Sequence, residues 1–200
     1  MKKYIYPIIA ALFLFSSINP AKAQAWERNS KVLSLGFGAS QFFHLDNYYY
    51  LGGNKPRDFR AWHLPITGQI NFQGEFGVHK YVGLGFTTGI GGAGRGPSYY
   101  GYAGEINAPI GFIVNFHFYQ LIADNTQKNI HANKLDIYAG LNLGSGIAFS
   151  FYRDGRNRVV PLAFGGPHVG IRYYFSPRVG INGELGWGKS LINAGFVFKI

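Results

Sequence analysis

Cysteine is absent from this 200-residue chain, and charged side chains make up only 14% of it. The lack of cysteine excludes a disulfide framework and an N-terminal lipid anchored on cysteine. Soluble domains carry about 25% charged residues, so the charge is low for a soluble protein. Beyond the N-terminus, no apolar run is long enough for a membrane helix.

The N-terminus has the layout of a secretory signal peptide. Lys2 and Lys3 precede an apolar run over 8–15, and the small-residue pattern of 21–23 follows. This arrangement predicts cleavage after Ala23. An N-terminal membrane anchor is the alternative, but the run falls well short of the ~20 residues that span a bilayer. We therefore expect a signal peptide over 1–23 and a single domain over 24–200.

The chain is basic. Removing Lys2, Lys3 and Lys22 with the signal peptide lowers the net charge from +10 to +7. An exported protein rarely meets nucleic acid, so we expect no nucleic-acid partner. Anionic lipid headgroups are the expected counter-charge.

Apolar and polar residues alternate with a period of two through most of the chain, which indicates strands with one apolar face. Most of these segments reach the 9–11 residues with which a tilted strand crosses a bilayer. Pro161 and Pro167 predict a bulge or an irregular start before the sixth strand, and Pro109 predicts a bulge in the fourth. The eight predicted strands are 31–40, 65–78, 81–90, 106–118, 135–151, 168–175, 179–187 and 192–200.

Alternation alone does not separate a soluble barrel, with its apolar face inside, from a membrane barrel, with its apolar face outside. The polar face is rich in glycine and amides, such as Gly36, Asn71 and Asn142. Glycine is costly in strands, but an eight-stranded barrel has a narrow interior that requires small inward residues. We therefore predict an all-β fold, an eight-stranded antiparallel transmembrane β-barrel with its apolar face outward and a lumen of glycine and polar residues.

Charges on the predicted inner face are nearly balanced, as a packed polar lumen requires. We predict ion pairs in the lumen, with a network around Glu184 and Arg172. His117 and His168 should also face the lumen, as hydrogen-bonded polar residues. The lumen ion-pair candidates are Glu75, Asp136, Arg172 and Glu184.

Loop lengths set the orientation, because extracellular loops are long and periplasmic turns are short. An even strand number places both termini in the periplasm, with the long 41–63 connection outside and the turns at 77–80 and 176–178 inside. The long 119–134 connection lies on the periplasmic side, so it either holds a short helix or the strand count is wrong there. Aromatic girdles are expected at both interfaces. The outer girdle comprises Tyr48, Tyr49, Tyr50, Trp62, Phe149, Phe151, Tyr152 and Trp187, and the inner one Phe116, Phe118, Tyr119, Tyr173 and Phe175.

The signal peptide, the eight amphipathic strands and the terminal "FVFKI" resemble small outer-membrane β-barrel proteins of the OmpA/OmpX type. The resemblance covers 31–200 as a pattern, without a peptidoglycan-binding domain. It implies that the barrel-assembly machinery reads the last strand, through Phe196, Phe198 and Ile200. The chain ends on isoleucine where the family pattern favours an aromatic residue.

Motifs for chemistry are weak. "GIGGAG" (89–94) fits a dinucleotide-binding pattern, but a loop follows it where that motif needs a helix. The six histidines show no metal-ligand spacing, and no histidine has a serine two positions on, as one lipid A deacylase family requires. We expect no enzyme activity, no metal and no cofactor. A lipid A-modifying enzyme and a narrow pore remain the alternatives.

The predicted extracellular loops are basic. Their cations could bind lipopolysaccharide phosphates, with a solvated rim without a specific partner as the alternative. We therefore expect a monomeric outer-membrane protein with a structural or surface-interaction role and with outer-membrane lipid as its surroundings. The lipopolysaccharide-contact candidates are Arg57, Arg60, Arg95, Arg153, Arg156, Arg158 and Lys189.

Overall fold

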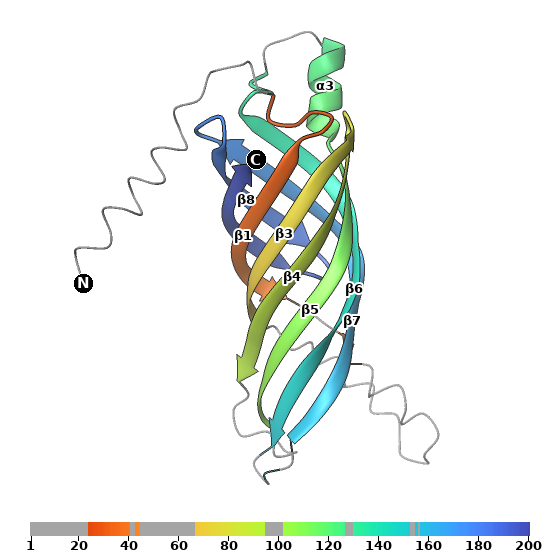
Figure 1. The fold of residues 1–200 in the computed structure, drawn as a ribbon, viewed down its shortest axis with the longest axis vertical. Helices are drawn as coiled ribbons and strands as arrows, with labels where there is room; N and C mark the ends of the chain where they lie inside the picture. Colours follow the sequence, from red (N-terminus) through yellow and green to blue (C-terminus); the bar gives the residue numbers. More distant parts are fainter. Residues whose placement is uncertain are drawn as a thin grey trace, which may run out of the picture.

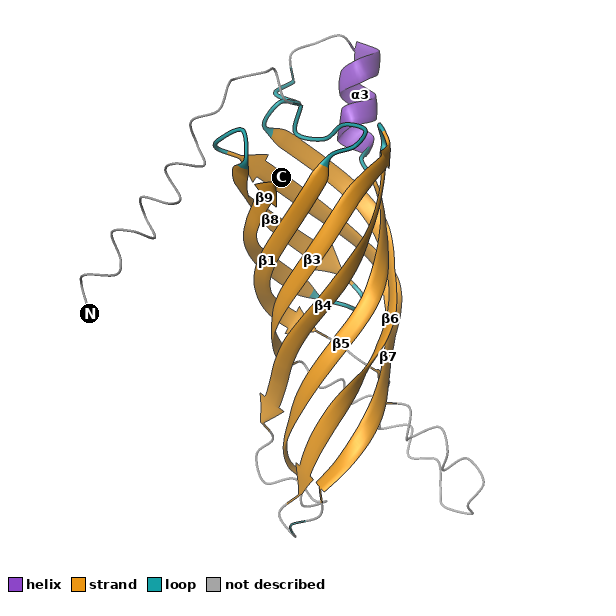
Figure 2. Ribbon diagram, in the orientation of Figure 1, coloured by secondary structure: helices purple, strands orange, loops and turns teal. Residues whose placement is uncertain are grey.

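Eight long antiparallel strands close into a barrel in the computed structural model, which describes residues 24–40, 43–44, 67–94, 102–126, 130–152, 155 and 157–200. A two-residue strand, β2 (Phe43–His44), pairs with β7, and a short helix, α3 (Phe118–Thr126), joins β5 to β6 (Figures 1 and 2). No helix in this described part of the chain is long and apolar enough to cross a membrane. The long strands are β1 (Lys31–Ser40), β3 (Thr67–His79), β4 (Val82–Gly94), β5 (Tyr102–Phe116), β6 (Leu135–Tyr152), β7 (Asn157–Tyr174), β8 (Val179–Gly186) and β9 (Ile192–Lys199).

The ring closes where β1 pairs with β9, and the strands are staggered around it. A path of paired residues that leaves β7 at Gly170 returns to β7 at Val160, ten residues away. Such a stagger tilts the strands relative to the barrel axis. The path runs through Gly170, Glu184, Asn193, Gly38, Gln69, Gly91, Asn107, Ala148 and Val160.

The predicted polarity of the barrel is confirmed. Large apolar side chains point outward along every long strand, with Phe112 76% exposed and Leu143 71% exposed. Polar and charged side chains such as Asn115, Arg172 and Glu184 are buried inside. Because hydrocarbon rather than water suits such an outer surface, the fold is that of a transmembrane barrel.

The lumen also holds an apolar cluster that alternation did not predict. Ala148 of β6 packs against Val160, Leu162 and Phe164 of β7, and all four are buried. The cluster lies toward the end of the barrel opposite the termini, since these residues are near the β6–β7 connection.

Strand boundaries differ clearly from prediction at three connections. The third strand ends at Gly94 rather than at residue 90, and the fourth begins at Tyr102 rather than at residue 106. The fourth strand ends at Phe116 rather than at residue 118, because α3 begins at Phe118; the long 119–134 connection thus holds a helix and the strand count stands. The sixth strand begins at Asn157 rather than at residue 168 and pairs with β6 without any register shift, so the predicted bulge or irregular start over 159–167 is wrong.

The predicted bulge at Pro109 is also wrong, because Pro109 pairs in register with Gly146. Its carbonyl accepts a hydrogen bond from the Thr88 hydroxyl at 2.9 Å. In β7, the Trp187 amide donates to the Pro167 carbonyl at 2.9 Å, so the backbone of Pro167 faces away from β6. Pro161, six residues earlier in the same regular strand, has the same orientation. Neither proline removes a bond from the β6–β7 ladder, because the missing N–H would point away from it.

The barrel wall is uneven in height. β6 and β7 have 18 residues each, whereas β8 and β9 have eight each. Both ends of the barrel domain lie at the end that carries α3, and β5, β6 and β7 extend far toward the opposite end (Figure 1).

Candidate functional site

An ion cluster fills the lumen near the end that holds the termini. Arg172 of β7 donates from Nη1 to Asp136 Oδ2 of β6 at 3.3 Å and from Nη2 to Glu75 Oε2 of β3. The side chains of all three residues are almost completely buried. Three of the four residues predicted to form ion pairs in the lumen are thus brought together.

His117 completes this cluster as a second cation candidate. It follows β5 and lies between the same carboxylates, with Nδ1 2.8 Å from Asp136 Oδ1 and Nε2 3.0 Å from Glu75 Oε1. Both ring nitrogens can donate to ionised carboxylates only when both carry a proton. The geometry therefore favours an imidazolium, so that two cations balance two anions in a region without solvent.

The segment before β1 folds into the mouth of the barrel. Trp26 is fully buried and stacks on His117, with ring centroids 3.6 Å apart and planes at 6°. The Ala25 amide donates to the Ala132 carbonyl at 2.8 Å, which fixes the segment against the β5–β6 connection. Trp26 has no signal in the sequence, because no periodicity extends to a residue before the first strand.

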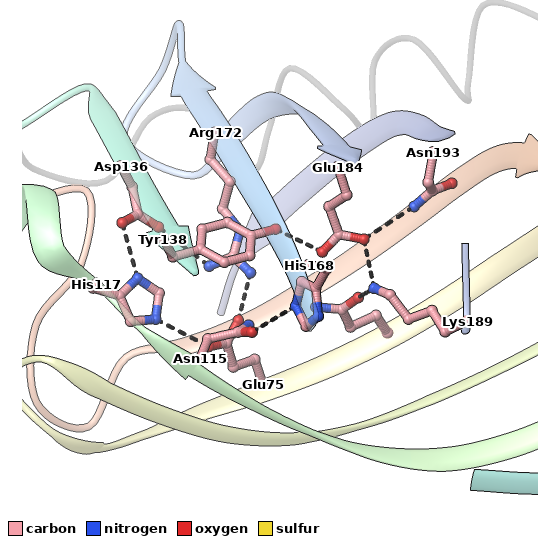
Figure 3. A network of polar contacts seen from close by, with 11 residues as sticks. Glu75, Asn115, His117, Asp136, Tyr138, His168, Arg172, Glu184, Lys189 and Asn193 are labelled. Atoms are coloured by element: carbon pink, nitrogen blue, oxygen red, sulfur yellow. Dashed lines mark hydrogen bonds and ion pairs between the residues drawn. The ribbon is translucent and has the colours of Figure 1, made fainter. Parts of the chain in front are cut away.

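A second ion cluster lies further along the lumen, around Glu184 of β8. Its Oε2 is 2.5 Å from Lys189 Nζ, and its Oε1 accepts the Tyr138 hydroxyl at 2.7 Å. Asn193 Nδ2 donates to Oε2 at 3.4 Å, and Lys189 also donates to Gln73. Glu184 was expected to interact with Arg172 but instead pairs with Lys189 (Figure 3).

The position of Lys189 corrects a prediction. The basic loops predict a lipopolysaccharide contact for this lysine at the extracellular rim, but it is 3% exposed and points into the lumen. The turn after β8 folds inward, because Asn142 accepts the Lys189 amide at 3.0 Å and donates to the Trp187 carbonyl at 2.9 Å. A buried lysine without an anion would be costly, and Glu184 supplies that anion.

Tyr138 of β6 connects the two clusters. Its hydroxyl reaches Glu184, and the guanidinium carbon of Arg172 lies 4.3 Å from its ring centroid. His168 lies beside it, with Nε2 2.8 Å from Asn115 Oδ1. The structure places His117 and His168 in the lumen, and Figure 3 shows the side chains of both clusters converging from different strands.

These side chains pack inside the barrel. Arg172, Tyr138, Trp26, Glu184 and Lys189 come from different parts of the chain and have almost no contact with solvent. The charges of Arg172, Glu184 and Lys189 are paired with oppositely charged side chains. In the described residues, no group of three or more histidine, cysteine, aspartate or glutamate side chains could hold a metal ion.

A polar cluster lies outside the barrel strands, at the rim that carries α3. Asp124 of α3 accepts hydrogen bonds from Tyr81 at 3.0 Å and Lys80 at 3.4 Å, both in the β3–β4 turn, and from Gln120 at 2.8 Å. Slight burial opposes the shift, but the hydrogen bonds from these three residues hold the pKa of Asp124 below its usual value. Hydrogen bonding with Tyr81 and Asp124 raises the pKa of Lys80.

Most predicted surface contacts lie outside the described residues, namely Arg57, Arg60, Arg95, Arg153 and Arg156, together with the aromatic residues Tyr48, Tyr49, Tyr50 and Trp62. Arg158, near the start of β7, is described and exposed. The residues of the proposed assembly signal point outward: Phe196 and Ile200 are exposed and Phe198 is half-buried.

Comparisons with known proteins agree with this architecture. No family model and no curated protein matches the chain. Neisserial surface protein A is 13% identical with a TM-score of 0.53, over 86% of this chain and 97% of that one. The N-terminal β-barrel domain of Pseudomonas aeruginosa OprF is 10% identical with a TM-score of 0.52, over 88% and 99%. The outer membrane protein OprG from Pseudomonas aeruginosa is 10% identical with a TM-score of 0.51, over 90% and 99%. At these identities the likeness establishes the fold, that of small eight-stranded outer-membrane barrels.

Proposed function

We propose that this protein is an integral outer-membrane barrel with a sealed lumen and a structural or surface-interaction role. The observation that carries the proposal is the pair of ion clusters inside the barrel. Arg172 and His117 are held by Glu75 and Asp136, and Lys189 is held by Glu184. A conducting lumen would require these buried, paired charges to separate, so neither steady transport nor catalysis is expected of it.

Outer-membrane localisation is supported by the apolar outer surface and by the fold of the similar structures. It is also consistent with the signal peptide predicted over residues 1–23. The barrel would then reach the membrane through the barrel-assembly machinery. Phe196, exposed on the last strand, and Ile200, exposed just after it, are available for that recognition.

The role at the surface would be exerted by the basic extracellular loops. Arginine binds phosphate groups in a bidentate manner, so the loop arginines suit the phosphates of lipopolysaccharide. Lys189 is no longer a member of this set, because it is committed to Glu184. The remaining candidates are Arg57, Arg60, Arg95, Arg153, Arg156 and Arg158.

Conductance of the purified protein in planar lipid bilayers tests the sealed lumen. We expect no steady conductance from the wild type, and openings from the Arg172→Ala and Lys189→Ala variants where these still fold. Steady wild-type channels that these substitutions leave unchanged would overturn the proposal.

Cell fractionation tests the localisation. The protein should be recovered in the outer membrane and should migrate differently on gels before and after heating, as folded barrels do. Recovery in the soluble periplasm would refute the architecture. Altered lipid A in the wild type compared with a deletion strain, measured by mass spectrometry, would instead favour an enzyme.

A further inference from the structure

The apolar outer surface is much taller on one side of the barrel than on the other. At about 3.3 Å per residue and a tilt of about 40°, an 18-residue strand rises roughly 45 Å and an eight-residue strand roughly 20 Å. β6 and β7 have 18 residues each, whereas β8 and β9 have eight residues each. The apolar band of outer-membrane barrels is about 25 Å tall, so the tall wall continues well beyond it.

The upper part of the tall wall is apolar on its outward face. Ile106, Phe149 and Val159 lie directly opposite one another on β5, β6 and β7 and are 51%, 44% and 61% exposed. Ala108, Ile147 and Pro161 form the row below. Phe149 lies three residues before the end of β6, which places it roughly 15 Å above the short wall. We refer to these six residues as the upper apolar face.

A protein strand is a poor partner for this region. On the side of β7 away from β6, β2 already pairs with Leu162 and Ala163, the Pro167 carbonyl accepts the Trp187 amide, and Pro161 supplies no donor. Proline at such positions prevents the addition of an external strand. The upper apolar face carries no charge that could steer or orient a polar partner.

The occupant that fits the upper apolar face is lipid hydrocarbon, which also surrounds the rest of the wall. The upper apolar face continues the hydrocarbon-facing surface of β5–β7, and the row that joins them, Ile110, Ser145 and Ala163, adds one uncharged hydroxyl. The alternative to hydrocarbon is a large apolar patch held in water or among sugars, which soluble surfaces rarely tolerate.

We infer that the upper apolar face binds acyl chains of outer-leaflet lipid, so that the barrel is surrounded by hydrocarbon of unequal height. The membrane would be raised beside β5–β7 and thin beside β8 and β9, as local bilayer adjustment to mismatch allows. The inference rests on the proposed membrane location, since it assigns lipid to one part of the same surface.

Spin labels at single cysteines test this inference, because the natural chain has no cysteine to interfere. The informative variant is Phe149→Cys. Phe37→Cys, on β1 and 66% exposed, marks hydrocarbon beside the short side, and Asn157→Cys marks the exposed start of β7. Each labelled protein is reconstituted into dioleoylphosphatidylcholine vesicles with and without lipopolysaccharide, and its folding is checked by heat-modifiable mobility. Collisions with oxygen and with a water-soluble nickel complex then report whether each label lies in hydrocarbon or in water.

The expected result is that labels at 37 and 149 collide with oxygen and not with nickel, whereas the label at 157 collides with nickel. Protection at 149 only when lipopolysaccharide is present would identify its acyl chains as the source. Free access of nickel at 149 in both kinds of vesicle would overturn the inference. Dipolar broadening at 149 would also overturn it, because a second copy would then cover the face. Access of nickel at 37 would instead refute the membrane location itself.

Discussion

The guanidinium of Arg172 lies over the ring of Tyr138, with its central carbon 4.3 Å from the ring centroid. Because the Tyr138 hydroxyl donates to Glu184, this contact joins the cluster around Arg172 to the cluster around Glu184. The lumen is therefore one connected polar core built from β3, β5, β6, β7 and β8. A barrel whose outer surface meets lipid derives its specific internal packing from such a core.

The first prediction concerns Arg172→Ala. This substitution leaves Glu75 and Asp136 buried with only His117 as a counter-charge. Breaking a buried pair by removing one partner costs about 3–5 kcal/mol. Urea unfolding in lipid vesicles and the temperature of heat-modifiable mobility should both show the loss.

The matched control is Lys134→Ala, which removes an exposed cation at the start of β6 and should leave stability unchanged. Wild-type stability for Arg172→Ala would show that the ion cluster does not support the barrel.

The second prediction tests the inward position of Lys189. Lys189→Ala leaves the Glu184 carboxylate without its cation and should destabilise the barrel by about 3–5 kcal/mol. The double variant Glu184→Gln with Lys189→Gln should lose less than the sum of the single losses, because the two residues share one interaction. Lys31→Ala, an exposed lysine of β1, is the control. Additive losses would argue against the pair.

The fold could be predicted from the sequence because apolar and polar residues alternate with a period of two along each strand, and each kind of residue lies on one face of the barrel wall. Parity also places Asp136, Tyr138 and Arg172 on the inner face, although only the charged members were selected. Tyr138 was missed because a large aromatic residue does not suggest a polar contact until its hydroxyl has a visible partner.

Other features of the site have no local signal. Lys189 lies in a turn, where alternation gives no direction, so its basic character suggested a surface residue. Its actual position depends on Asn142, 47 positions away in the chain. The position of Trp26 likewise depends on His117, since the two rings stack only once the barrel has formed. The pairing of Glu184 with Lys189 rather than with Arg172 follows from three-dimensional packing and not from the spacing of charges.

The third prediction concerns the space beside Tyr138. A Cβ atom added to Gly170 would lie less than 3.0 Å from three atoms of the Tyr138 side chain. Gly170→Ala should therefore push this ring away from Glu184 and Arg172 and destabilise the barrel by about 1–3 kcal/mol.

Gly183→Ala is the control for this prediction, because its nearest neighbour would be Ile171 at 3.8 Å. In a Tyr138→Ala background, the cost of Gly170→Ala should largely disappear, since the clash has been removed. A cost that persists there would locate the crowding elsewhere.

The fourth prediction concerns Pro161. Replacing it with threonine adds an N–H group to the side of β7 that faces away from β6, next to the bridge between Ala163 and Phe43. An exposed donor row promotes pairing between sheets. We expect Pro161→Thr to increase self-association in detergent, measured by size-exclusion chromatography with light scattering.

Pro109→Thr is the control for Pro161→Thr, because β5 is paired on both sides by β4 and β6. Unchanged mass for both variants would show that the proline does not protect the edge.

The fifth prediction concerns the pH dependence of the docking of α3 against the β3–β4 turn. The pKa of Asp124 is lower in the folded protein than its usual value of 3.8, so ionised Asp124 stabilises the contact between α3 and the β3–β4 turn. This contribution is fully present above pH 3.8 and is lost as the pH falls through the lowered pKa. The rate of amide hydrogen exchange in α3, corrected for the intrinsic pH dependence of exchange, should therefore be low at neutral pH. Below pH 3.8 this rate should rise relative to that of the barrel strands.

In the Asp124→Asn variant, the exchange rate of α3 relative to the strands should already be raised at neutral pH and should not change across this range. A wild-type profile as flat as that of the variant would show that the contacts of Asp124 with Lys80 and Tyr81 do not hold the helix.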